Sequence, residues 1–165
     1  NTKSLTAVTL QGLLSPLLES VNMINAPVIA KERDIEITEI THDRAGAFQT
    51  LITLTVTTES QTRSVSGTLS NDDEPRIVQI RGIPIDAELG PHILYVINRD
   101  KPGFIGSLGT ILGDADINIA TFNLGRERSG GEAVALIEVD QLVPENVMAA
   151  VKALPHVVQV KTLSF

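Results

Sequence analysis

The chain has 165 residues, which suits one ordinary domain or two small ones, and its 42% hydrophobic and 20% charged residues are typical of a folded protein. Its net charge of −7, without a basic cluster, argues against nucleic acid and anionic membranes as partners, and the lack of cysteine excludes disulfides, thiol nucleophiles and Cys-ligated zinc. No apolar run approaches the roughly 20 residues of a membrane span, and no signal-peptide pattern opens the chain, so we expect a cytoplasmic protein. The chain opens on Asn1 without a Met, which we interpret as a fragment of a longer protein.

The first half predicts two helices followed by a small antiparallel sheet. Apolar residues recur at helical spacing from Leu10 to Ile24, where Pro16 is expected to kink or divide the helix, and a short second helix is expected after Ala26-Pro27. Alternating and β-branched runs then predict strands, one beginning within residues 35–40 and the others at 51–58, 63–69, 76–80 and 83–85. We expect a partial α+β domain over residues 1–88, truncated at its N-terminus, with its helices on the sheet and its boundary within Asp86–Pro91.

The second half, residues 89–165, predicts the order strand, helix, strand, strand, helix, strand. The strands are expected at residues 92–97, 118–126, 133–139 and 157–163, and the helices at 104–115 and 147–154. This order is typical of the ferredoxin-like βαββαβ fold, a four-stranded antiparallel sheet with both helices on one face. By the right-handed crossover rule its first and second strands run parallel, with another strand between them. The expected fold class of the chain is therefore α+β.

A polar loop between the first strand and first helix of this half is the candidate site. The loop Asn98–Gly103 leads into a helix N-terminus, whose free N–H groups and positive dipole end can hold a carboxylate. The N–H groups in question belong to Gly103, Phe104 and Ile105. Asn98 and Asp100 lie two residues apart and so face the same side of an extended segment, while Asn118 starts the next strand. The plainer interpretation is that these three polar residues cap the helix or a turn.

Other motifs carry less chemistry. Gly103, Gly106 and Gly109 lack the G-x-G-x-x-G spacing of a dinucleotide-binding turn. Their spacing puts Gly106 and Gly109 on one helix face, where they would permit a close helix contact, admit a ligand, or simply be tolerated. We expect no catalytic constellation and no metal site, because the acidic run at residues 72–74 is expected to be a solvated turn and the histidines are isolated. The three histidines are His42, His92 and His156.

Two parts of the chain resemble domains that occur together in one enzyme family. Ile97–Gly103 and Asp116–Ala120 resemble the amino-acid-binding ACT domain, in particular that of the NAD-dependent D-3-phosphoglycerate dehydrogenases of serine biosynthesis. Asn1–Thr6, Val21–Pro27 and Val65–Leu69 are similar to the intervening, or allosteric substrate-binding, domain of the long-form enzymes. The chain thus resembles the regulatory C-terminal region of that family.

The resemblance implies that L-serine or a similar small amino acid binds between ACT domains of a homo-oligomer, held by Asn98, Asp100 and Asn118, and exerts feedback control. It also implies that the catalytic residues and the NAD belong to domains upstream, so this fragment would have no cofactor and no turnover of its own. Within residues 76–90 only Arg76 and Arg81 are cationic, so a second, phosphorylated effector is less expected.

The position of Asn118 favours a site shared between two chains. Asn118 follows a helix of roughly 12 residues, about 18 Å long, so one serine cannot reach both Asn118 and Asp100 of the same chain. A twofold partner with an antiparallel helix would supply its own Asn118, and pairing of the two first strands would cover an open sheet edge. Two alternatives stay open: the ACT-containing part of an iron–sulfur L-serine dehydratase, and an oligomerisation module without a ligand.

Overall fold

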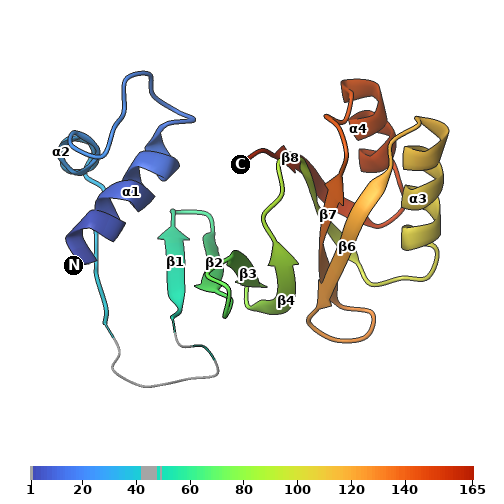
Figure 1. The fold of residues 1–165 in the computed structure, drawn as a ribbon, viewed down its shortest axis with the longest axis horizontal. Coiled ribbons are helices and arrows are strands. Elements are labelled where there is room, and N and C mark those ends of the chain that lie inside the picture. The colour runs from blue at the N-terminus through green and yellow to red at the C-terminus, as the bar shows by residue number, and fades with distance from the viewer. Residues whose placement is uncertain (1, 42–47, 49) are drawn as a thin grey trace. The chain divides into compact units, whose positions relative to one another are not determined.

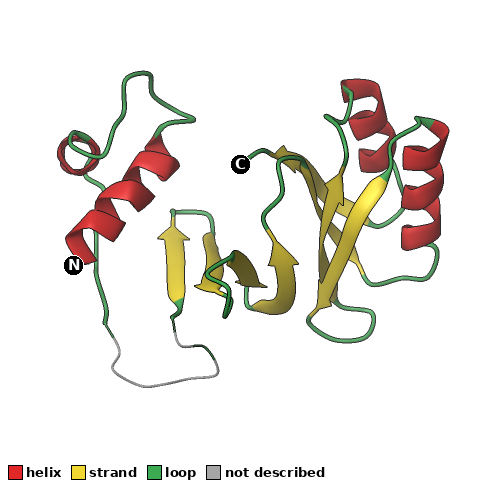
Figure 2. Ribbon diagram, viewed as in Figure 1, coloured by secondary structure: helices red, strands yellow, loops and turns green. Residues whose placement is uncertain are grey.

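The computed structural model describes residues 2–41, 48 and 50–165 (Figure 1). The chain divides into two compact units, Asn1–Arg44 and Ala45–Phe165. The described part of the first unit is helical, and the second unit holds two four-stranded antiparallel sheets and two helices (Figure 2). This confirms the α+β class, while the predicted domain limits 1–88 and 89–165 stay a prediction. None of the helices in these residues is long and apolar enough to cross a membrane.

The helical unit contains α1 (Thr2–Leu14) and α2 (Ala26–Glu32), which pack around a small core. The core consists of Leu10, Leu14, Ala26 and Ala30. The helical pattern expected up to Ile24 is wrong beyond Leu14, because Pro16 disfavours helical geometry at the residue before it and cannot donate its own backbone hydrogen bond. Leu17 and Ile24, from the far part of that pattern, are 74% and 88% exposed.

The strand predicted to begin within residues 35–40 is also wrong, since residues 35–41 form neither helix nor strand. The chain leaves α2 through Asp34 at a φ of 54°, and the N–H of Ile35 donates to the carbonyl of Ala30. Farther along, Glu39 accepts a hydrogen bond of 2.5 Å from the hydroxyl of Thr6 in α1. Of the apolar residues of the segment, Ile35 packs against the core of the helical unit, while Ile37 and Ile40 are exposed. The predicted packing of the helices on the neighbouring sheet stays a prediction.

The first sheet is an antiparallel meander in the order β1-β2-β3-β4. Its strands are β1 (Ile52–Thr57), β2 (Thr62–Leu69), β3 (Pro75–Ile80) and β4 (Ile83–Glu88). Arg81 and Gly82 make the two-residue turn between β3 and β4, with φ angles of 54° and 79°. Strand β4 continues to Glu88 and so includes the first residues of the boundary expected within Asp86–Pro91, and that boundary stays a prediction.

The second sheet and its two helices form the expected ferredoxin-like unit. Its elements are β5 (Ile93–Arg99), α3 (Phe104–Asp114), β6 (Ile119–Arg126), β7 (Glu132–Val139), α4 (Glu145–Lys152) and β8 (Val157–Leu163). The strand order is β6-β7-β5-β8, all pairs being antiparallel, so β5 and β6 run parallel with β7 between them, as predicted. Leu108 and Leu112 of α3 and Val147 and Val151 of α4 are buried with apolar residues of the sheet.

The opposite face of this sheet is covered by β4. Ile83, Ile85 and Ala87, the alternate residues of β4, are buried in one cluster with residues of β5 and β7. At the end of β6, a Cβ added to Gly125 would lie 2.2 Å from the carbonyl oxygen of Pro84, so only glycine permits this approach of the two backbones. The two sheets of the second unit therefore share a continuous apolar contact.

One expectation about assembly is wrong at this level. Strand β5 is paired on both sides, with β7 and with β8, so the first strands of two chains cannot pair edge to edge. In this sheet the outer strands are β6 and β8.

Candidate functional site

Asn98 lies at the end of β5 on the face that carries the helices. Side chains alternate along the strand, and Leu94 and Val96 of the same face belong to the core beneath the helices. Asn98 is only 2% exposed, its Nδ2 donates to the carbonyl of Arg99 at 3.0 Å, and its Oδ1 is buried without a hydrogen-bond partner among the described residues. A buried acceptor without any partner costs on the order of 1–3 kcal/mol, so such groups usually pair with an ordered water, an ion or a ligand.

Asp100 is held by the hairpin that joins β6 to β7. Its Oδ2 accepts a hydrogen bond from Nη1 of Arg126 at 3.0 Å and another from the N–H of Gly130 at 3.2 Å, while its own N–H donates to the carbonyl of Gly131 at 2.8 Å. The Arg126 guanidinium, and then the Gly130 N–H, hold the pKa of the Asp100 carboxyl below its usual range. The carboxylate is therefore charged and fixed in place at neutral pH.

The N-terminus of α3 opens toward the same place. Gly103 precedes the helix with a φ of 96°, a left-handed conformation that favours glycine, and no side chain caps this end of the helix. The first N–H to reach back is that of Ser107, which donates to Gly103, so the preceding N–H groups have no intrahelical acceptor. Those groups belong to Phe104, Ile105 and Gly106. Residues 100–106, with Arg126 and Ser129, line an open pocket of about 360 Å³.

These contacts decide against the plainer interpretation of two of the polar residues. Neither Asn98 nor Asp100 caps α3, because Asn98 bonds to the backbone of Arg99 and Asp100 to the hairpin. Asp100, Gly103, Phe104 and Ile105 lie together at the pocket, as expected from the sequence. Asn98 does not line the pocket and sits under the start of the loop.

Asn118 is not brought to this pocket within the chain. It is exposed, its Nδ2 donates to Oδ2 of Asp140 at 2.8 Å, and its carbonyl accepts from the N–H of Asp140 at 3.2 Å. Helix α3, with 11 residues, separates it from the loop of Asp100 by about 16 Å at 1.5 Å per residue.

The glycines of α3 have free space beside them. A Cβ added to Gly106, Gly109 or Gly113 would meet no described atom within 4 Å. The close helix contact considered for Gly106 and Gly109 is therefore not made by the described residues of this chain, and a contact with another molecule stays a prediction.

Arg126 and the hairpin loop were missed by the sequence-based expectation. Arg126 is paired with Ala133 of β7, and Ala133 is paired in turn with Asn98 of β5, so the three residues lie in one row across the sheet. The predicted strand limits and the ferredoxin-like order together place Arg126 at the same sheet end as the loop. The position of Arg126 beside the loop could therefore have been predicted from the sequence, but only from the strand order of the whole sheet and not from the pattern of a single strand.

The other candidate chemistry plays no part at this pocket. Among the described residues no group of three His, Asp or Glu side chains is placed to hold a metal ion. His92 and His156 use their carbonyls to accept the N–H groups of Val139 and Arg99, and His42 lies outside the described residues. Gly103 lies in the turn between β5 and α3, but Gly106 and Gly109 lie within the helix, so these glycines do not fit the pyrophosphate of NAD.

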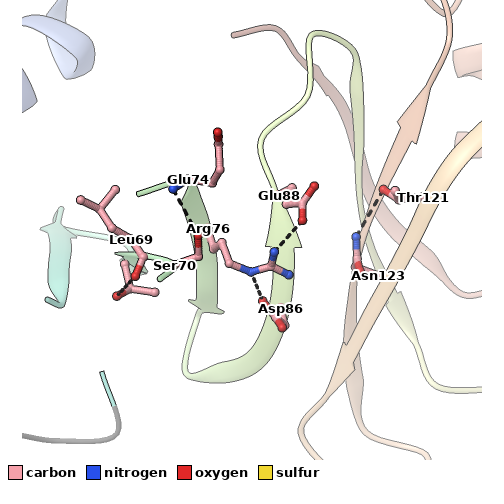
Figure 3. A network of polar contacts seen from close by, with 9 residues as sticks. Leu69, Ser70, Glu74, Arg76, Asp86, Glu88, Thr121 and Asn123 are labelled. Carbon is pink, nitrogen blue, oxygen red and sulfur yellow. Dashed lines mark hydrogen bonds and ion pairs between the residues drawn. The ribbon is translucent and has the colours of Figure 1, made fainter. Parts of the chain in front are cut away.

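Two arginines of the first sheet, Arg76 in β3 and Arg81 in the turn to β4, are paired with carboxylates. Figure 3 shows the guanidinium of Arg76 pointing toward Asp86 and Glu88. Its Nε lies 2.7 Å from Oδ1 of Asp86 and its Nη1 lies 2.6 Å from Oε1 of Glu88, while Nε of Arg81 lies 3.0 Å from Oε1 of Glu132. These carboxylates occupy donors that a phosphate would need, and the reduced expectation of a second, phosphorylated effector stays a prediction.

Comparison with known proteins identifies both parts of the chain. Residues 1–81 match the D-3-phosphoglycerate dehydrogenase intervening domain, and residues 92–156 match the ACT domain. The D-3-phosphoglycerate dehydrogenase of Bacillus subtilis is 36% identical over 163 residues, which are 98% of this chain and 31% of that protein. The enzyme of Methanocaldococcus jannaschii is 35% identical over 94% of this chain and 29% of its own length, and that of Synechocystis 31% over 92% and 27%. The chain spans less than a third of these relatives, and it is an intervening domain of the D-3-phosphoglycerate dehydrogenase type joined to an ACT domain.

Proposed function

We propose that this chain is the regulatory part of an NAD-dependent D-3-phosphoglycerate dehydrogenase and that it binds L-serine, or a similar small amino acid, for feedback control of serine synthesis. The observation that carries the proposal is the pocket in which the fixed carboxylate of Asp100 faces the uncapped N-terminus of α3. The match to an ACT domain and the phosphoglycerate dehydrogenase relatives support it. A cytoplasmic parent enzyme, with catalytic residues and NAD in other domains, belongs to the same proposal.

The pocket complements the two charges of an amino acid. The free N–H groups of the first turn of α3, at the positive end of its dipole, would receive the ligand's carboxylate. Asp100 would receive the ammonium group in a charge-assisted hydrogen bond. Oδ2 of Asp100 already accepts from Arg126 and Gly130, so the ammonium would bind Oδ1 or share Oδ2. The unpaired Oδ1 of Asn98, once the loop adjusts, is an acceptor for the same ammonium or for the serine hydroxyl.

The third expected ligand residue, Asn118, would come from a second chain. Within one chain α3 separates it from Asp100, while a twofold-related chain with an antiparallel helix would bring its Asn118 to the loop. The open faces of Gly106 and Gly109 support such an approach. Binding that requires both chains would favour one assembly over another, which is how a ligand biases an enzyme between states.

Calorimetric titration of the 165-residue chain with L-serine tests the proposal. Asp100→Ala should weaken binding by about 1.5–3 kcal/mol, since it removes a hydrogen bond to a charged group. Asn118→Ala should also weaken binding, although its position in the chain is remote from the loop. Asp72→Ala, a change in an exposed turn carboxylate, is the matched control and should leave affinity unchanged. If serine and other small amino acids fail to bind the unaltered chain, the domain is an oligomerisation module without a ligand.

A further inference from the structure

The hairpin between β6 and β7 is held from two directions. On one side its residues Arg126, Gly130 and Gly131 make the three hydrogen bonds that fix Asp100. On the other side Glu132, at the start of β7, contacts Arg81 in the turn of the first sheet. Its Oε1 lies 3.0 Å from Nε of Arg81, and its Oε2 accepts from Nη2 at 3.2 Å. The hairpin thus contacts both the loop Asn98–Gly103, which we call the effector loop, and Arg81 of the intervening domain.

The last two residues of strand β6, Gly125 and Arg126, also contact both parts, one on each face of the sheet. Gly125 faces β4, where a Cβ would lie 2.2 Å from the Pro84 carbonyl oxygen and 3.0 Å from the Ile83 side chain. The next residue, Arg126, points to the opposite face, as strand geometry requires, and reaches Asp100. Because the backbones of β4 and β6 are in close contact at Gly125, a shift of β4 toward β6 must move the end of β6. The guanidinium of Arg126, which holds Asp100, would move with it.

The conformation of Arg81 suggests that its contact with Glu132 is specific. Both residues of its turn have a positive φ, and at the first position of such a turn Asn, Asp or Gly is preferred. Arginine gains nothing there from the backbone, but its guanidinium reaches Glu132 as a two-point contact between side chains that are 28% and 33% exposed. Arg81 thus combines an unfavourable backbone conformation with a contact to a residue far along the chain. Such an outlier is one from which a functional role can be inferred.

We propose that the β6–β7 hairpin couples the effector loop to the sheet of the intervening domain, with Arg81 and Glu132 acting as positioning residues for amino-acid binding at Asp100. The inference rests on the proposed function of that loop. All the groups that fix Asp100 belong to the hairpin, and the hairpin is in turn fixed by Glu132 and Gly125. Coupling is reciprocal. A change in the stability of the sheet alters the affinity for the amino acid, and binding of the amino acid alters the stability of the sheet by the same free energy.

The first test measures serine affinity in variants that do not touch the pocket. Arg81→Asn keeps a residue that tolerates the turn and removes the ion pair, and Glu132→Gln removes the same pair from the other side. Each should weaken serine binding about 2- to 30-fold. The double variant should bind serine no more weakly than the single variant with the lower affinity, because both substitutions remove the same contact between Arg81 and Glu132. Asp72→Ala changes an exposed carboxylate in the turn between β2 and β3 of the same sheet and should leave the affinity unchanged.

The second test needs no ligand. Amide hydrogen exchange is measured in Arg126→Gln, and in Asp100→Asn as a second variant. If the hairpin couples the two sites, amides of β4 should exchange faster in both variants, while those of α4, whose buried residues belong to the separate core beneath the helices, should not. Unchanged exchange in β4, or wild-type serine affinity in both Arg81→Asn and Glu132→Gln, would overturn the coupling. If the unaltered chain binds no serine, the proposed function fails and the exchange measurement alone decides the coupling.

Discussion

At the scale of single residues, Asp100 is the group whose chemistry depends most on its surroundings. Its carboxylate oxygen contacts a guanidinium and a backbone N–H that come from 26 and 30 residues farther along the chain. Both contacts favour the charged form, so the pKa of Asp100 is lowered. A fixed, charged carboxylate beside free helix N–H groups is what an amino acid requires, and a protonated one would lose the ammonium contact.

Removing the guanidinium should therefore raise the pKa of Asp100. In Arg126→Gln we expect it to move toward the ordinary Asp value of about 3.9, with the Gly130 N–H still holding it slightly below. The sign for stability follows from the lowered pKa. The contribution of the Asp100–Arg126 contact is fully present above the ordinary Asp value and is lost as the pH falls through the lowered pKa. Acid titration of the side-chain carboxyl signal by NMR measures this directly. Arg76→Gln should leave the Asp100 pKa alone, and an unshifted value in Arg126→Gln would contradict the assignment.

At the scale of elements, two kinds of glycine have opposite surroundings. Gly125 in β6 lies against the backbone of Pro84, whereas Gly109 in α3 has open space where a side chain would go. The first glycine is required by the contact between two strands. The second only lowers the intrinsic stability of its helix, by on the order of 0.5–1 kcal/mol relative to alanine.

Alanine substitutions should separate the two cases. Gly125→Ala forces a shift of β4 or β6 and should destabilise the chain by about 1–3 kcal/mol. Gly109→Ala should stabilise an isolated chain by about 0.5–1 kcal/mol, because alanine is the better helix former. Urea unfolding at low protein concentration checks both. A neutral Gly125→Ala would show that β4 and β6 do not approach as closely as the structure has them.

At the scale of the whole molecule, the proposed effector site is incomplete in one chain. The Asp100 pocket and Asn118 lie at opposite ends of α3, and Asn118 is engaged with Asp140 instead. Since β5 is central, the strands left for pairing at the edges of this sheet are β6 and β8. A second copy would thus have to approach along α3 or one of these edges.

Serine should therefore tighten self-association. A ligand that binds only the assembled site stabilises it by about 2.7 kcal/mol per site at a concentration 100-fold above its dissociation constant. Sedimentation velocity with and without serine should show the dimer persisting to lower protein concentration with serine. Gly109→Ala should weaken this dimer if α3 lies at the contact, even though it stabilises the single chain. A monomer that binds serine with full affinity would refute the shared site.

Much of this protein could be predicted from its sequence, because the deciding interactions are local. The apolar runs of β5 and β7 and the helical spacing of α3 and α4 depend on neighbours within a few residues. For the same reason, the local sequence pattern predicted the loop Asn98–Gly103 and the free N–H groups at the start of the helix that follows it. The order of elements then led to the ferredoxin-like arrangement through the crossover rule.

The tertiary structure decided what depends on distant partners. Residues 35–40 form no strand, and of their three isoleucines only Ile35 packs against the helices, which a short alternating pattern cannot reveal. The pairing of Asp100 with Arg126 and the contact of Gly125 with Pro84 join segments 26 and 41 residues apart. Such contacts follow from strand order and sheet-on-sheet packing, in which many residues could lie opposite one another and the buried apolar area selects one register. Local patterns therefore predicted the loop of the proposed site, and contacts between distant segments select Arg126 and Gly130 as the groups that hold Asp100.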